Sequence, residues 1–274
     1  MTAETKRDQM VCRMPWPSFG FALEPIEFEH TSFSRNRRSS KVNESPQVYA
    51  WGDLTARFRT IIARQREDRT FFFRHGATKY NERNLVSGQH NTALSSRGRM
   101  QAEKLGASLP IQIDLIVCSS LRRSVETMIL SVPRGRQIGV PVRVDPRLDE
   151  VHLGHLQGRR RKHLAHFEDG DLDFAPQGGE SYRQAAQRVL SVIVDIFDAL
   201  ALSGTSPRHA VVFCHAGVLR IIATLVAGQQ NPRDVFRTGF ANAECLIMSA
   251  RQIGLPAYWK EEHDAGHVVE RHSL

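Results

Sequence analysis

The sequence of 274 residues has few cysteines and no long apolar run. Its four cysteines, Cys12, Cys118, Cys214 and Cys245, form no CxxC pair and show no disulfide-framework spacing, which is typical of a protein from a reducing compartment. No run of about 18 or more apolar residues is present, and the start of the chain, MTAETKRDQM, has no apolar stretch of the kind that a secretory signal needs. We therefore expect a cytoplasmic protein that does not enter a membrane.

Acidic residues are fewer than basic ones, so the net charge is +8 and the isoelectric point is about 9.7. The excess of positive charge lies mainly in the segments KRDQ, SRNRRSSK and GRRRKH. Aromatic residues are not interleaved with these segments, and no zinc-finger spacing or helix-turn-helix signature is present, so we expect no specific binding of nucleic acid. A small anionic substrate accounts for a basic surface equally well.

The first fifty residues differ from the rest of the chain. Residues 1–50 are rich in Pro, Ser, Asn and Arg, and no apolar period persists in them, which predicts a poorly ordered basic N-terminal extension. Residues 51–274 have the apolar content and periodicity of a folded domain.

Short apolar segments alternate with amphipathic ones after residue 50. The predicted strands are residues 70–73, 113–118, 142–144, 210–214 and 244–249. The predicted helices are residues 53–62, 95–109, 120–130, 180–202 and 217–228. This alternation predicts an α/β fold, a three-layer α/β/α sandwich with a mostly parallel central sheet.

Two histidines follow two of the predicted strands. In FFFRHG an apolar strand ends in Arg74 and His75, and VVFCHAG presents His215 in the same way. Ligands of parallel α/β sheets bind at the carboxyl ends of the strands, near helix N-termini that favour anions. One histidine at a strand end is usually structural, but two in matched settings, one of them beside an arginine, indicate a site.

Histidine and arginine together fit the chemistry of phosphoryl transfer. A neutral imidazole, with a pKa near ~6.5, is a nitrogen nucleophile that needs no strong base to activate it. The forked donors of arginine match the oxygens of a phosphoryl group, and a carboxylic acid can protonate the leaving alkoxide. The sequence therefore predicts a site with one attacking histidine, several arginines and one acid.

Six motifs carry a resemblance to the histidine phosphatase superfamily, the phosphoglycerate-mutase-like proteins. RHGATKYN resembles the R-H-G-x-T/S signature, with an Asn shortly after it. The other similar segments follow in the order of the family: NTALSSRGRMQAEKL with Leu94, Gly98, Gln101 and Ala102, then CSSLRRSVET, RLDEVHLGHLQG, PQGGES and FCHAGVLR. The resemblance covers roughly residues 68–250, and six motifs in order are a strong signal. It identifies residues 51–274 as a histidine phosphatase domain.

The resemblance implies a role for each matching residue. His75 is the nucleophile that becomes phosphohistidine, and Glu150 donates a proton to the leaving group and then activates water. The remaining implied site residues are Arg74, Arg123 and His215 around the phosphoryl oxygens, and Asn81, Thr78 and Ala216 as substrate-binding candidates. The family implies no metal and no cofactor.

Some positions depart from the family pattern. Ala77 stands where many members have Glu or Gln, and Asn91 replaces a frequent Asp. Cys214 stands where Ser is common, and we interpret it as a small buried residue. Arg122 is predicted to lie at the surface or the rim of the site.

Two other readings of the function stay open. Glu150 and Glu180 are 30 residues apart, which is too short for the usual mutase lid and favours a histidine acid phosphatase-type phosphomonoesterase that acts on a small phosphorylated metabolite. The segment HLGHLQG resembles the mutases, so a phosphoglycerate mutase is one alternative function. A non-catalytic basic binding protein is the other. The sequence leaves open the physiological substrate, the role of residues 1–50 and whether the chain forms a homodimer.

The segment after Glu150 is unusually rich in histidine and arginine. His152, His155, His163 and His166 form two HxxH patterns, which suggests zinc, but we favour polar residues around the rim of the site. The GRRRKH segment, residues 158–163, is predicted to favour substrates with a second negative group if it lies near the site.

Overall fold

The computed structural model describes residues 49–63, 68–133, 135, 139–164, 171–201, 208–227, 234–237, 239–249 and 271–272. The described residues form a sheet of six strands in the order β3-β2-β4-β1-β5-β6. The strands are β1 Arg69–Arg74, β2 Leu115–Cys118, β3 Val142–Val144, β4 His209–Cys214, β5 Cys245–Ser249 and β6 Arg271–His272. The prediction for residues 1–50 concerns positions that lie, apart from the last two, outside the described residues.

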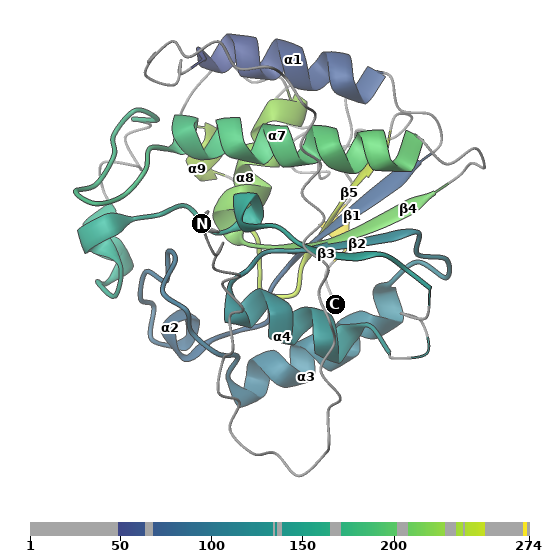
Figure 1. Cartoon of the computed structure of the whole chain (residues 1–274). Helices are drawn as coiled ribbons and strands as arrows, with labels where there is room; N and C mark the ends of the chain where they lie inside the picture. The colour runs from purple at the N-terminus through teal and green to yellow at the C-terminus, as the bar shows by residue number, and fades with distance from the viewer. Residues whose placement is uncertain are drawn as a thin grey trace, which may run out of the picture.

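Helices cover both faces of the sheet. The α-helices are α1 Trp51–Ala63, α2 Lys79–Glu82, α3 Ser96–Leu105, α4 Arg122–Ser131, α7 Tyr182–Ala201, α8 Ala216–Ala227 and α9 Asp234–Arg237. Short 3-10 helices are η1 Gly106–Ser108, η2 Pro146–Leu148, η3 Gly154–Leu156 and η4 Arg161–Leu164. Figure 1 shows α1, α7, α8 and α9 on one face and α3 and α4 on the other. The predicted three-layer sandwich is confirmed.

The sheet is mostly parallel, as predicted. Strand β1 pairs in parallel with β4, and β2 pairs in parallel with both β3 and β4. Strands β5 and β6 are antiparallel additions at one edge. The two central strands, β1 and β4, are therefore flanked on both sides.

The apolar run of β1 is explained by burial on both faces. Successive side chains of a strand point to opposite faces. Phe72 belongs to the core under α7 and α8, whereas Phe71 and Phe73 belong to the core under α3 and α4. Phe72 and Phe73 have no exposed surface, and every residue of this strand after Arg69 is buried.

Several predicted boundaries need correction. Helix α1 begins at Trp51 rather than at Asp53, and the buried Trp51 adds to its packing against α7 and α8. Helix α3 ends at Leu105, where the chain tightens into η1, and β2 begins only at Leu115. The predicted capping box of α7 is confirmed, because Ser181 N donates to Gln184 Oε1 at 2.8 Å and Gln184 N donates to Ser181 Oγ at 3.2 Å. The last residue of the helix predicted at 217–228 lies outside the described residues.

In the part of the chain that the structure describes, none of the helices combines the length and the apolar character needed to cross a membrane.

Candidate active site

The register of the two central strands brings the two histidines together. Arg74 lies opposite Cys214 in the parallel β1–β4 pair, so the next residues, His75 and His215, leave the sheet at the same edge. Their ring centroids are 5.2 Å apart, and His75 N donates to Cys214 O at 3.1 Å. The site predicted from two similar strand ends is therefore one place in the structure.

The ring of His75 is held as a neutral imidazole with an unprotonated Nε2. Its Nδ1 lies 2.7 Å from Gly76 O, and because a carbonyl only accepts, Nδ1 carries the proton. The unprotonated Nε2 then accepts from Arg123 Nε at 3.1 Å. Burial, followed by the charges of Arg123 and Arg74, lowers the pKa of His75 well below its ordinary value. The ring keeps an available nucleophilic nitrogen at neutral pH.

Hydrogen bonds and close packing fix the backbone after His75. The residues that make these contacts were recognised in the sequence only as matches to the family motifs. Gly76 N donates to Thr127 Oγ1 at 3.0 Å, and Ala77 N donates to Gln101 Oε1 at 2.9 Å. A Cβ on Gly98 would lie 1.9 Å from Ala77 O, so only glycine lets α3 approach this loop. The motif positions of Gly98, Gln101 and Thr127 were the signal for these roles, which sequence reasoning did not assign.

Arg123 is completely buried beside His75. Besides its bond to the ring, its Nη1 donates to His90 O at 2.8 Å and its Nη2 donates to Gly88 O at 2.7 Å. These partners are neutral, so they orient the guanidinium without cancelling its charge. Burial lowers the pKa of Arg123 to about 10, with Glu150 acting in the opposite direction, and the side chain remains a cation at neutral pH.

Arg74 supplies a second buried guanidinium at the tip of β1. Its Nη1 donates to Phe240 O, and its Nε is buried without a hydrogen-bond partner among the described residues. Burial lowers its pKa to about 10, so it too is charged at neutral pH. A buried cation with an unused donor is costly unless an anion satisfies it, and the site is therefore suited to an anionic ligand.

His215 is fully buried and has a different partner from His75. Its Nε2 lies 2.6 Å from Ser119 Oγ. Its Nδ1 has no hydrogen-bond partner within the described part of the chain. Burial, then Arg123 and His75, lowers the pKa of His215 well below its ordinary value.

The carboxylate of Glu150 lies at the start of α8. Gly217 N donates to Glu150 Oε1 at 3.0 Å and to Oε2 at 3.2 Å, and Val151 N donates to Oε1 at 3.0 Å. A helix N-terminus favours a negative charge. A Cβ on Gly217 would lie 2.3 Å from Oε1, so this glycine makes room for the acid. Sequence reasoning missed Gly217, although the glycine of the HAG motif was the available signal.

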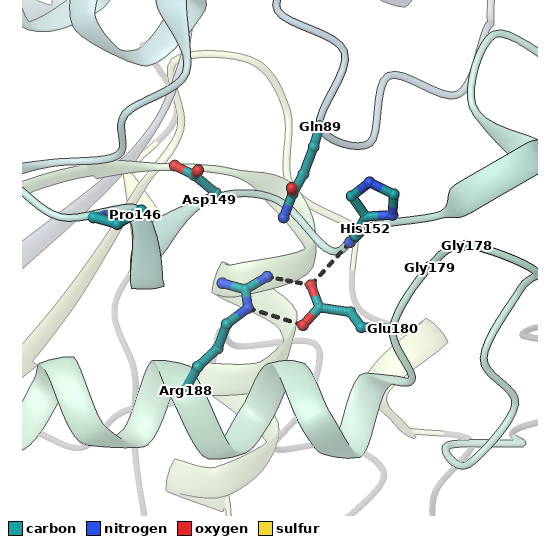
Figure 2. Close-up of a pocket in the computed structure, with 8 residues that line it drawn as sticks. All are labelled: Gln89, Pro146, Asp149, His152, Gly178, Gly179, Glu180 and Arg188. Atoms are coloured by element: carbon teal, nitrogen blue, oxygen red, sulfur yellow. Dashed lines mark hydrogen bonds and ion pairs between the residues drawn. The ribbon is translucent and has the colours of Figure 1, made fainter. Parts of the chain in front are cut away.

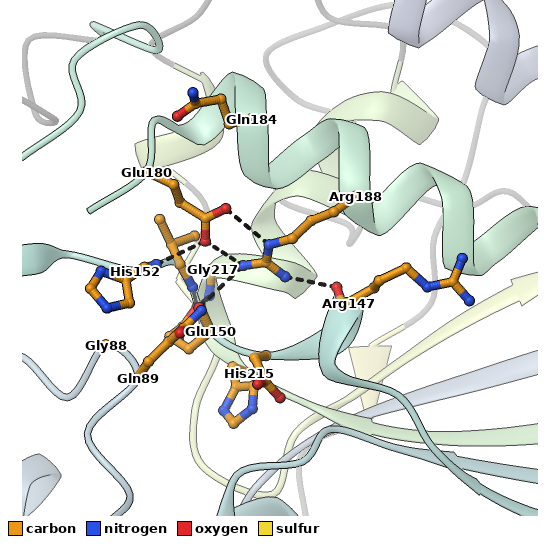
Figure 3. A network of polar contacts seen from close by, with 12 residues as sticks. Gly88, Gln89, Arg147, Glu150, His152, Glu180, Gln184, Arg188, His215 and Gly217 are labelled. Atoms are coloured by element: carbon orange, nitrogen blue, oxygen red, sulfur yellow. Dashed lines mark hydrogen bonds and ion pairs between the residues drawn. The ribbon is translucent and has the colours of Figure 1, made fainter. Parts of the chain in front are cut away.

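A polar network fixes the backbone of Glu150, as Figure 3 shows. Arg188 Nη2 donates to Glu150 O at 3.2 Å, and Gln89 Nε2 donates to the same oxygen at 3.0 Å. Arg188 also forms an ion pair with Glu180 at 2.6 Å, and Glu180 Oε1 accepts from His152 N at 2.9 Å. Neither Arg188 nor Gln89 was predicted, since neither was carried over from the family's motifs.

A pocket of about 380 Å³ lies beside this network. Figure 2 shows Gln89, Asp149 and His152 around it, above the ion pair of Glu180 with Arg188. None of His75, Arg74, Arg123, Glu150 and His215 lines this pocket.

Asn81 and Thr78 form a capping box at α2. Thr78 N and Thr78 Oγ1 both donate to Asn81 Oδ1 at 3.0 Å, and Asn81 N donates back to Thr78 Oγ1 at 3.2 Å. Asn242 Nδ2 adds a contact to Asn81 Oδ1 at 3.3 Å and another to His75 O at 3.2 Å. The oxygen of Asn81 is thus occupied, and its amide nitrogen is the group left for a ligand, whereas the hydroxyl of the fully buried Thr78 is used inside the protein.

Other predicted positions have simple structural surroundings. Ala216 is buried as the first residue of α8, and Cys214 is fully buried, as predicted. Asn91 Oδ1 accepts from Arg122 N at 2.7 Å, and the side chain of Arg122 pairs with Glu126 at 2.7 Å.

The histidine-rich segment shows no metal-binding arrangement in the described residues. His152 Nδ1 accepts from Gly154 N at 3.2 Å, and His155 and His163 are exposed. No group of three or more His, Cys, Asp or Glu side chains within the described ranges is placed to hold a metal ion. His166 lies outside those ranges.

Comparison with known proteins identifies the family of the chain. The model of the histidine phosphatase superfamily (branch 1) matches residues 70–255. The glucosyl-3-phosphoglycerate phosphatase of Mycolicibacterium vanbaalenii is 34% identical over 173 residues, which are 58% of this chain and 74% of that protein. A 2,3-bisphosphoglycerate-dependent phosphoglycerate mutase of Streptococcus agalactiae is 36% identical over 97 residues, only 34% of this chain and 42% of the mutase.

A search of solved structures also finds a phosphatase. The native structure of mycobacterial glucosyl-3-phosphoglycerate phosphatase is similar with a TM-score of 0.58 and 30% identity, over 66% of this chain and 90% of that one. The chain therefore belongs to branch 1 of the histidine phosphatase superfamily.

Proposed function

We propose that the protein is a phosphatase that hydrolyses phosphomonoesters through a phosphohistidine on His75. The observation that carries this proposal is the unprotonated Nε2 of His75, which lies 3.1 Å from the guanidinium of Arg123. A neutral nitrogen nucleophile beside two buried cations is suited to attack on a phosphorus atom whose oxygens carry negative charge.

The proposed reaction has two steps. In the first, Nε2 of His75 attacks phosphorus, the bond to the ester oxygen breaks, and Glu150 gives its proton to that oxygen. In the second, the carboxylate of Glu150 takes a proton from water, whose oxygen attacks phosphorus and releases His75. Glu150 thereby returns to its protonated state, so that one acid serves both steps.

Positive charge in the proposed site comes from the protein itself. Arg74 and Arg123 spread the charge of the phosphoryl oxygens, and the amide nitrogen of Asn81 adds a neutral donor. Because the pKa of His75 is held well below its ordinary value, the nucleophile stays neutral in mildly acidic solution. This supports activity of the acid phosphatase type without a metal ion.

The proposed substrate is a small phosphorylated metabolite with a second negative group. Gly158 N donates to Val86 O at 2.8 Å, and Val86 N donates to Arg159 O at 2.8 Å, so the basic segment 158–163 runs beside the loop whose Gly88 holds Arg123. The side chains of this segment from Arg159 on are exposed. The related mycobacterial enzyme is a phosphatase of glucosyl-3-phosphoglycerate, which agrees with a small substrate.

Hydrolysis is favoured over the two alternatives. Only 30 residues separate Glu150 from Glu180, and the match to the mutase covers 42% of that protein, against 74% for the phosphatase. A non-catalytic basic protein would have no need for the assembled set of His75, Arg123, Glu150 and His215.

The test is release of phosphate from a generic aryl phosphate in EDTA, by the wild type and by His75→Ala. Activity that survives the chelator and disappears in the variant supports a metal-free phosphohistidine mechanism. Activity that the variant retains would overturn the assignment of the nucleophile. A folded wild type that leaves the ester intact but moves a phosphoryl group between phosphoglycerates would favour the mutase.

A further inference from the structure

A short chain of hydrogen bonds leads from His215 to a buried carboxylate. His215 Nε2 lies 2.6 Å from Ser119 Oγ, and Ser119 Oγ lies 2.7 Å from Asp149 Oδ1. Ser119 has no exposed surface, and Asp149 is 8% exposed. The three residues come from the end of β4, the end of β2 and the segment before Glu150, so only the tertiary structure joins them.

The number of available hydrogens decides which group donates in each of these hydrogen bonds. Asp149 also accepts from Ser120 N at 2.8 Å and from Ser120 Oγ at 2.7 Å, which is the arrangement of an ionised carboxylate that only accepts. The single hydroxyl proton of Ser119 is therefore directed at Asp149. Ser119 Oγ must in turn accept from His215, and the proton of the neutral ring lies on Nε2.

The other nitrogen of His215 is left without a proton or a partner. Nδ1 is buried and unbonded among the described residues, while the ring lies 5.2 Å from that of His75. A lone pair would repel a phosphate dianion, but it can accept the proton of a phosphate monoanion. Nδ1 is thus suited to a ligand that brings its own proton.

We propose that Ser119 and Asp149 are positioning residues that hold the proton of His215 on Nε2, so that Nδ1 takes up the proton of an incoming phosphate group. In this step the O–H bond of the monoanion breaks and an Nδ1–H bond forms. A dianionic phosphoryl group then lies beside an imidazolium, which donates to it. The inference rests on the proposed function, because it deepens the role of His215 in that site.

The surroundings of His215 explain why the proton arrives only with the ligand. The charged and titratable side chains that face it are Arg123 on α4, His75 and Arg74 at the tip of β1, and Arg188 on α7. All of these oppose a positive charge on His215, and the carboxylate of Asp149 reaches the ring only through Ser119. A bound phosphate adds negative charge, which favours the imidazolium.

The first experiment observes the ring directly by long-range ¹H–¹⁵N NMR of the labelled protein, with His215 assigned by comparison with His215→Asn. In the free wild type we expect a neutral ring protonated on Nε2. Saturation with inorganic phosphate is expected to move the Nδ1 signal to that of a protonated nitrogen. A free ring protonated on Nδ1, or an Nδ1 signal that phosphate leaves unchanged, would overturn the proposal.

The second experiment compares Ser119→Ala with Ser120→Ala. Both variants remove a hydroxyl that donates to Asp149, but only Ser119→Ala also removes the oxygen that faces His215 Nε2. Without this acceptor the proton of His215 is no longer held on Nε2, and a histidine in the wrong tautomer loses much of its function, so we expect kcat/KM to fall about 10-fold. Ser120→Ala is the matched control, for which we expect less than about a threefold change and an unaltered tautomer.

The two proposals fail in distinguishable ways. The tautomer of the free protein and its response to phosphate need no catalysis, so they test this inference even if His75→Ala retains activity. Conversely, a Ser119→Ala protein whose His215 keeps the Nε2 tautomer and full activity contradicts the inference while leaving His75 as the nucleophile. Equal losses in Ser119→Ala and Ser120→Ala would also contradict it, since only the first variant removes a contact to His215.

Discussion

The tips of β1 and β4 each present a histidine, but the two rings have different partners. At the tip of β1 the carbonyl of Gly76 holds the proton of His75 on Nδ1, and Nε2 accepts from Arg123. At the tip of β4 the proton that we propose on Nε2 of His215 faces Ser119 Oγ, and Nδ1 has no partner among the described residues. Similar sequences thus give one proposed nucleophile and one proposed ligand-binding group, because the partners of each ring differ.

The glycines that follow the two histidines differ in the same way. A Cβ on Gly76 would lie 2.3 Å from Gly98 O, a backbone atom of α3. A Cβ on Gly217 would lie 2.3 Å from Glu150 Oε1, the end of a side chain. The first glycine allows close packing of the fold, whereas the second leaves space for the proposed proton donor.

The largest expected difference between the two tips is in catalysis. His75→Ala removes the attacking atom and is expected to reduce kcat for an aryl phosphate by at least about 10⁴-fold. His215→Asn keeps the nucleophile but loses a group that stabilises the phosphoryl charge, and about a 10²- to 10³-fold loss is expected. Quenching a reaction with radiolabelled substrate in alkaline denaturant, in which phosphohistidine survives, separates them: His215→Asn should still yield a phosphoenzyme, and His75→Ala should yield none. A labelled His75→Ala protein would contradict the comparison.

The next effect concerns the glycine beside the acid. In Gly217→Ala the new methyl group displaces the carboxylate of Glu150, so we expect kcat for alkyl phosphates to fall about 100-fold, with a much smaller loss for aryl phosphates, whose leaving groups need no proton. Alanine in place of a helical glycine stabilises by about 0.5–1 kcal/mol, which offsets part of the cost of crowding Val151 Cγ2, 2.9 Å from the new Cβ. Glu150→Gln is the control and should show the same dependence on the leaving group. Equal losses for both ester types would argue against this role of Gly217.

The glycine of α3 is expected to affect stability instead. A methyl group on Gly98 meets the backbone of Ala77 at 1.9 Å, which cannot move as a side chain can, and the unfolding free energy should fall by about 1–3 kcal/mol. Urea denaturation measures this loss. Gly52→Ala in α1 is the matched control, because no atom lies within 4 Å of its new Cβ; it should be neutral or stabilising. A Gly98→Ala protein as stable as that control would contradict the close packing.

The smallest effect is the dependence of stability on pH. The pKa values of His75 and His215 are both lowered in the folded protein, so below pH ~6.5 the unfolded chain binds protons that the folded one does not. The stability present above that pH is therefore lost on acidification, at up to about 1.4 kcal/mol per pH unit for each histidine. Urea denaturation at pH 7.5 and at pH 5.5 should show a smaller loss for His215→Asn than for the wild type. The same loss in both proteins would show that His215 is not held neutral by the fold.

Much of the fold could be predicted because the signals are local. The apolar runs predicted β1, β2 and β4, and the periodicity predicted α7 together with its capping box. β6 and the short α2 and α9 were not predicted, because elements of two to four residues give too little periodicity. β5 was predicted as a strand, but its antiparallel place at the sheet edge beside β1 and β6 depends on pairing between distant segments.

The sequence by itself predicted an α/β sandwich and the residues His75, Arg123, Glu150 and His215 as members of one site, since each lies in a motif similar to those of the family. Tertiary structure decided what those residues touch. The proton of His215 depends on Ser119 and Asp149, which are 96 and 66 positions away, and the acid depends on space beside Gly217, 67 positions from it. Hydrogen bonds act over a few ångströms in space, and a linear pattern records no such distances.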